Sequence, residues 1–120
     1  MKFIHLLSKE ARLRLIELAL SRRSAKELAE ELGLSPAAIS KYTSGKMHPS
    51  DDTIRRLFMI LDPEEHIRAY TIILEDLAYG LEELLEHVSS NGIEVLSDRE
   101  FQSIIRALYE YLGEYIRNYM

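Results

Sequence analysis

The side chains with the most familiar chemistry in this 120-residue chain are its histidines and carboxylates. There is no cysteine, which excludes disulfides, thiolate nucleophiles and cysteine-ligated zinc. The four histidines have no compact ligand spacing. His87 lies four residues after Glu83 on a predicted helix, but one such pair is usually a solvated surface contact. No Ser–His–Asp order or phosphate-binding glycine loop is present. We therefore expect neither an enzyme nor a metal or cofactor site.

The charged residues are divided unevenly along the chain. Residues 1–62 hold 11 Lys and Arg against 8 Asp and Glu, a formal charge of +3, whereas residues 63–120 hold 4 against 12, a charge of −8. The basic half can face phosphate, which would repel the acidic half. The charge division therefore predicts two parts with different partners, although an acidic half would also keep the protein soluble.

The elements that position these side chains are expected to be helices almost throughout. Apolar and polar residues never alternate over a strand-length run, which argues against a sheet. Serines and aspartates mark the helix starts, including a Ser24–Glu27 capping box and a cap–proline pair at Ser35-Pro36. Further starts are expected after Ser8, at Ser50 or Asp51, at Asp62-Pro63, and at a second capping box formed by Ser97 and Glu100. Residues 91–96 follow a turn signal and are expected to form a loop.

These patterns predict an all-α protein with two parts. Residues 1–62 would form a four-helix domain, and residues 63–120 an antiparallel helical hairpin. Between 25 and 42, two short helices must cross steeply around a tight turn. Ala29 supplies the small residue at the crossing, and Gly33 supplies a residue that tolerates positive φ. The aliphatic residues of this segment would share one core: Leu28, Leu32, Leu34 and Ile39.

Residues 25–42 resemble the Cro/repressor (xenobiotic-response-element) family of helix-turn-helix domains. The resemblance continues through the loop at 42–50, with its Gly45, Lys46 and Pro49, and into the helix that follows, so that it covers roughly residues 8–61. It implies binding to double-stranded DNA and regulation of transcription, and we expect a repressor. The corresponding location is the cytoplasm, in association with the nucleoid. No apolar run approaches the roughly 20 residues needed to cross a bilayer.

The family's docking mode implies roles for particular residues. The helix over 36–43 would lie in the major groove. The implied base-facing residues are Pro36, Ala37, Ser40 and Lys41. The implied phosphate contacts are Ser24, Lys26, Ser44, Lys46, Arg22 and Arg23, and the helix after the loop could add Arg55 and Arg56.

The base-facing positions depart from the family pattern. Many members carry glutamine, asparagine or arginine where this chain has Pro36, Ala37 and Ala38. Alanine can touch a thymine methyl group but makes no bidentate hydrogen bond. We therefore expect modest base discrimination, with much of the affinity coming from phosphates and DNA shape.

The C-terminal half has apolar residues in uninterrupted steps of three and four, the pattern of a heptad seam. Two such seams predict a hairpin, and further apolar residues beside them need another surface to cover them. We expect that surface to be a second copy, which gives a four-helix bundle and two reading helices about 34 Å apart. The expected dimer interface consists of Ile67, Tyr70, Leu74, Leu77, Leu81, Leu84, Phe101, Ile105, Leu108, Leu112 and Tyr115.

Other hypotheses remain open for the C-terminal half. It could pack on the chain's own N-terminal domain, or it could hold a small effector among its tyrosines. It could also bind another protein, as in an antitoxin or plasmid-partition adaptor that binds DNA through its other half. Finally, the whole chain could be an interaction module that binds no DNA.

Overall fold

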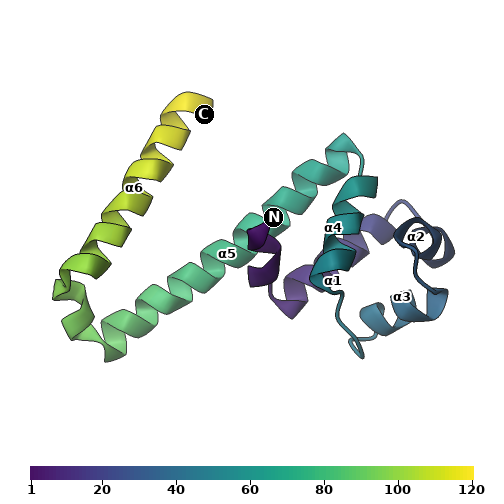
Figure 1. The fold of residues 1–120 in the computed structure, drawn as a ribbon, viewed down its shortest axis with the longest axis horizontal. Helices are drawn as coiled ribbons and strands as arrows, with labels where there is room; N and C mark the ends of the chain where they lie inside the picture. Colours follow the sequence, from purple (N-terminus) through teal and green to yellow (C-terminus); the bar gives the residue numbers. More distant parts are fainter. The chain divides into compact units, whose positions relative to one another are not determined.

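The computed structural model describes residues 1–120 and contains only helical elements (Figure 1). They are the 3₁₀ helix η1 (Lys2–Leu6), the helices α1 (Lys9–Leu20), α2 (Ala25–Leu32), α3 (Pro36–Thr43), α4 (Asp51–Ile60) and α5 (Pro63–Asn91), the 3₁₀ helix η2 (Ile93–Ser97) and the helix α6 (Arg99–Tyr119). The predicted all-α fold is confirmed. The chain forms two compact units, Met1–Tyr79 and Gly80–Met120, each described by itself. None of the helices is long and apolar enough to span a membrane.

The helix starts follow the capping residues read from the sequence. Ser8, Ser24, Ser35 and Ser50 each accept a hydrogen bond from the backbone amide three residues later. Each such cap stabilises its helix by about 1 kcal/mol. One expected start is wrong: the amide of Phe101 donates to Asp98, not to Ser97, so α6 begins one residue later and without the Ser97–Glu100 capping box.

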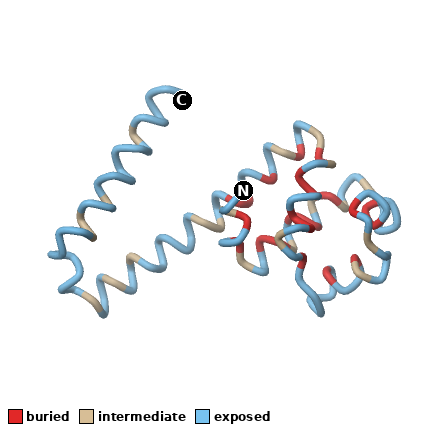
Figure 2. The backbone as a smooth tube through the Cα atoms, in the orientation of Figure 1, coloured by how far each residue is buried: buried red, intermediate tan, exposed pale blue.

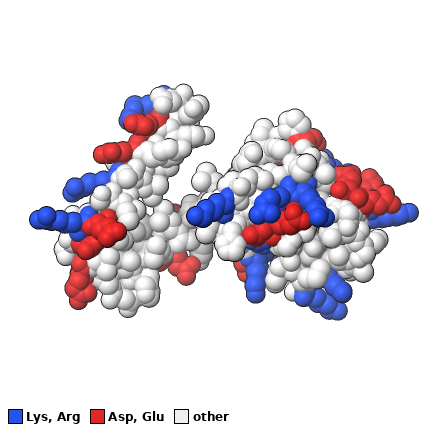
Figure 3. All heavy atoms as spheres, viewed as in Figure 1, with Lys and Arg blue, Asp and Glu red and all other residues white.

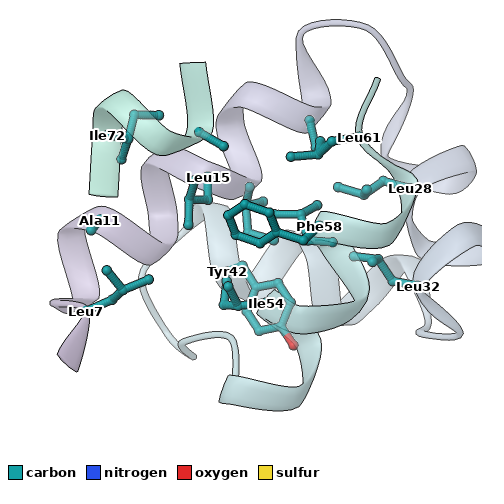
Figure 4. Packing of buried hydrophobic residues seen from close by; sticks show 14 of the residues in the cluster. Leu7, Ala11, Leu15, Leu28, Leu32, Tyr42, Ile54, Phe58, Leu61 and Ile72 are labelled. Carbon is teal, nitrogen blue, oxygen red and sulfur yellow. The ribbon is translucent and has the colours of Figure 1, made fainter. Parts of the chain in front are cut away.

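The core of the first unit lies among α1 to α4 (Figures 2 and 4). Leu28, Leu32 and Ile39 are buried as expected, and Leu34 is half-buried against the same cluster. Large aliphatic side chains of η1, α1 and α4 also have almost no exposed surface: Ile4, Leu15, Ile16, Ile54 and Leu57. This core holds α3 against α1 and α2, so the orientation of α3 is fixed by packing.

The first turns of α5 belong to the same unit. Ala69, Ile72 and Ile73 are buried in its core. Ser8, before α1, donates its backbone amide and hydroxyl to the two oxygens of Asp76, at 3.0 and 2.5 Å. Arg23, after α1, binds Glu65 near the start of α5. The two helices therefore run antiparallel, and α5 covers an apolar face that α1 and α4 leave open. The first compact unit thus extends past residue 62. The sequence placed the division between two functional domains at that residue, and this division stays a prediction.

The second unit, Gly80–Met120, consists of the last turns of α5, η2 and α6. The expected pair of helices with a short connection is present, and α6 makes its close contacts with η2. The connection is a 3₁₀ turn where a loop was expected, because the amides of Val95 and Asp98 donate to the carbonyls of Gly92 and Val95. No residue of this unit is buried (Figure 2).

Candidate nucleic-acid interface

The helix α3 separates its residues cleanly between core and solvent. Ile39 and Tyr42 are buried and belong to the core of the first unit. Figure 4 shows Tyr42 among the other core residues. The four residues expected to face bases are all exposed: Pro36, Ala37, Ser40 and Lys41. Because 3.6 residues make one helical turn, these four lie on one side of α3. The only long polar side chain among them is that of Lys41.

Two glycines with positive φ set the ends of this helix and its approach. Gly33 has φ 69° after α2, and the next amide, that of Leu34, donates to the carbonyl of Ala29 at 2.8 Å. Gly45 has φ 76° after α3, where the amides of Lys46 and Met47 both donate to the carbonyl of Lys41. Left-handed backbone is favourable only for glycine. The turn predicted at Gly33 is therefore confirmed, and Gly45 reverses the chain so that Lys46 is exposed.

A buried arginine holds the loop after α3 in place. Arg12 of α1 donates to the carbonyls of Ile4 and Pro49 at 2.8 and 2.9 Å and to Asp51 at 2.6 Å. The hydrogen bond from Arg12 lowers the pKa of the Asp51 carboxyl, and the neighbouring His5 adds to the effect. The loop and the start of α4 are thus fixed to α1 by Arg12, a residue to which no sequence pattern pointed.

The segment that forms α3 and its two flanking loops carries no acidic residue. Residues 33–50 contain no Asp or Glu. Every arginine of residues 1–62 is in an ion pair, whereas Lys26, Lys41 and Lys46 are exposed and in none. At the lower right of Figure 3, along the edge where α3 and its loop lie, basic side chains appear without acidic ones. This edge can therefore take a polyanion without displacing ion pairs.

Comparison with known proteins agrees with this geometry. The model of a family described as Helix-turn-helix, of the Cro/C1 type, matches residues 11–62. Residues 11–62 are a Cro/repressor-type helix-turn-helix domain. The domain is that of a DNA-binding regulator of transcription, and its family is not an enzyme family. No curated protein and no solved structure matches the chain.

Within and beside the helix-turn-helix domain, two of the expected phosphate contacts have other partners. Arg22 donates to Asp62 and Glu64 at 2.6 and 2.7 Å, and these hydrogen bonds and charges raise its pKa. The side chain of Arg23 is only 12% exposed and binds both oxygens of Glu65, at 2.7 and 2.9 Å. A phosphate would have to compete with these carboxylates for both guanidinium groups. The structure therefore gives Arg22 and Arg23 a structural role, joining α1 to the start of α5.

The two serines expected at phosphates are also engaged. The backbone amide of Ser24 faces the Glu27 carboxylate at 3.4 Å, which places a negative charge at the start of α2. The hydroxyl of Ser44 donates to the carbonyl of Lys41 at 3.2 Å. Both would need a side-chain rotation before they could donate to phosphate. The free groups of the helix-turn-helix domain are its three lysines.

Proposed function

We propose that this protein is a dimeric repressor that inserts α3 into the major groove of its operator. The observation that carries the proposal is the acid-free surface of α3 and its loop, on which Lys41 and Lys46 have no ion-pair partner. In this arrangement Pro36, Ala37, Ser40 and Lys41 face base edges. Lys26 and Lys46 contact phosphates on either side of the groove.

The small side chains on α3 limit direct readout. Ala37 offers a methyl contact to thymine, and Lys41 can donate to a guanine. Phosphate contacts and DNA shape supply the remaining affinity. Sequence preference in the whole protein then depends on two copies reading two half-sites at a fixed spacing.

The dimer is supported by apolar surface in the C-terminal half. Ile67 and Leu74 are 68% and 69% exposed, and no residue of Gly80–Met120 is buried. Large exposed apolar patches are typical of protein–protein interfaces. A two-fold dimer through residues 63–120 covers this surface and presents two α3 helices to an operator with about 34 Å between half-sites.

Charge reversal on α3 and its loop tests DNA binding. The double variant K41E/K46E should weaken binding to operator or bulk duplex by roughly 100-fold or more, because it replaces attraction to DNA by repulsion. The matched control is K2E/K9E, which makes the same change of charge at exposed lysines of η1 and α1. Far-UV circular dichroism checks that both variants fold. Equal binding by the two variants would contradict the docking face.

A DNA-binding adaptor that captures another protein is the second candidate, because the same exposed apolar surface also fits a foreign partner. Light scattering of the purified protein separates the two functions. A dimer at micromolar concentration supports the repressor. A strict monomer that still binds DNA supports the adaptor.

A further inference from the structure

The helix α5 has two apolar faces within Met1–Tyr79. One face packs into the core through Ala69, Ile72 and Ile73. At 100° per residue the other face lies on the opposite side of the helix. Its three large side chains are 68%, 54% and 69% exposed: Ile67, Tyr70 and Leu74. One edge of this face touches the core, because the rings of Tyr70 and Phe58 have centroids 5.6 Å apart. Ile67 and Leu74 are the uncovered apolar residues of α5 in this unit.

Steps of three and four continue along α5 through Leu77, which packs partly against the core, and into the second unit. There they include Leu81 and Leu84, which are 38% and 53% exposed, and end at the half-buried Val88. We call the set from Ile67 to Val88 the α5 stripe. Twenty-one residue steps at 1.5 Å each give it a length of about 32 Å.

The helix α6 has a matching face. Its large apolar and aromatic residues fall on about 160° of the helix circumference, with Arg99, Arg106 and Arg117 on the opposite side. These apolar residues are Phe101, Ile104, Ile105, Leu108, Tyr109, Tyr111, Leu112, Tyr115, Ile116 and Tyr119. A face this wide is typical of a helix that contacts more than one neighbour. None of its residues is buried.

The two surfaces agree in length and register. The 21 residues of α6 extend for about 31 Å, close to the length of the α5 stripe. An antiparallel arrangement places Phe101 beside Val88, Leu108 beside Leu81 and Tyr115 beside Leu74, and keeps apolar residues opposite one another from Tyr70 to Val88. The arginines of α6 then face water.

We propose that the α5 stripe of one chain is covered by α6 of a second copy, so that the two chains exchange their α6 helices. The proposal rests on the dimer proposed above and specifies how it is built. Within Gly80–Met120, α6 packs on η2, and Leu81 and Leu84 of α5 stay exposed. Backbone hydrogen bonds to the carbonyls of Gly92 and Val95 order the turn at η2, on which α6 packs.

The second unit by itself indicates that α6 needs a partner. No residue of Gly80–Met120 is buried, although α6 carries ten large apolar or aromatic side chains. Exposed apolar surface of this extent is typical of a protein–protein interface.

The absence of cysteine makes the exchange directly testable. One tagged chain carries Leu74→Cys and a second, differently tagged chain carries Tyr115→Cys, and the two are co-expressed and treated with a short bismaleimide. Exchange predicts a cross-linked product that contains both tags. A mixture of Leu74→Cys and Phe101→Cys chains is the register control, because position 101 then lies about 21 Å further along the stripe and should not react. Circular dichroism and DNA binding verify that each variant folds.

A chain that carries both Leu74→Cys and Tyr115→Cys distinguishes exchange from a closed hairpin. Exchange gives a two-chain product from this variant. A cross-link within one chain, or no product from either arrangement, would overturn the exchange. Light scattering of the same samples distinguishes failure of the exchange from failure of the dimer. A protein that is dimeric but gives no mixed product would contradict only the exchange. A monomeric protein would contradict both the exchange and the dimer.

Discussion

At the scale of single residues, one ion pair joins three segments of the first unit. Arg23 donates to the carbonyls of Ala19 and Ile60, both at 3.1 Å, and to both oxygens of Glu65. The ends of α1 and α4 and the start of α5 therefore meet at one guanidinium group. The Glu65 side chain is 1% exposed, so its charge is compensated by Arg23 and not by water.

Removing the carboxylate of this pair should strongly destabilise the protein. We expect Glu65→Ala to lower the free energy of unfolding by about 3 kcal/mol, because it leaves the largely buried Arg23 with only the more exposed Glu31, at 3.3 Å, as a charge partner. The double variant Arg23→Met with Glu65→Leu should recover much of that loss. Urea unfolding measures both. Glu64→Ala is the control, since the exposed Glu64–Arg22 pair contributes little, and an equal loss there would contradict the argument.

Three carboxylates of the first unit, Glu65, Asp51 and Asp62, predict how the stability of the fold depends on pH. The hydrogen bond from Arg23 lowers the pKa of Glu65, the hydrogen bond from Arg12 lowers that of Asp51, and a backbone hydrogen bond at Glu65 lowers that of Asp62. Each folded-state pKa lies below its unfolded value, so each group stabilises the fold fully above the ordinary values of 4.5 for Glu and 3.8 for Asp. This stabilisation is lost as the pH falls through the lowered values.

Urea midpoints measured from neutrality down to about pH 3 should therefore fall below about pH 4.5, and Glu65→Gln should make the fall shallower. A midpoint that rises on acidification would contradict the assignment.

At the scale of elements, the turn between α2 and α3 depends on the backbone of Gly33. A Cβ at this position would meet the nearest atom, Nη1 of Arg56, at 3.7 Å, which is an ordinary contact. The cost of a side chain therefore comes from its φ of +69° alone.

We expect Gly33→Ala to destabilise the protein by about 1–2 kcal/mol. Gly80→Ala is the matched control, because Gly80 lies inside α5 with open space around it and without positive φ. Alanine should stabilise that helix by up to about 1 kcal/mol. Thermal unfolding at one fixed protein concentration compares the two variants, and the same sign for both would contradict this explanation.

At the scale of the whole molecule, the salt dependence of DNA affinity should be moderate, because few lysines contact phosphates. With Lys26 and Lys46 at phosphates in each of two copies, the slope of log affinity against log salt should be about −4. Lys46→Ala should reduce its magnitude by about 2 per dimer, whereas Arg22→Ala should leave it unchanged, because Arg22 is paired with Asp62 and Glu64. Binding measured over a range of salt concentrations tests both, and a slope near zero would contradict the electrostatic account.

The sequence by itself determined the local features. Ser8, Ser24, Ser35 and Ser50 begin the helices they were predicted to begin, and Gly33 has the positive φ that its place in the motif required. These features depend on residues within about four positions of one another, so a short stretch of sequence contains the whole signal. The same holds for α3, where helical periodicity alone separates buried Ile39 and Tyr42 from the exposed residues between them.

Only the tertiary structure decided which charged groups are available. Arg12 reaches Pro49 and Asp51, and Arg23 reaches Ile60 and Glu65, over 37 to 42 positions. No periodicity links such residues, because the partner is set by how the helices pack. Folding thus pairs Arg22 and Arg23 with carboxylates and leaves Lys26, Lys41 and Lys46 without ion-pair partners. It also buries one face of α5 on the DNA-binding unit and leaves the opposite apolar stripe exposed, a choice between two faces of the same helix that only packing could make.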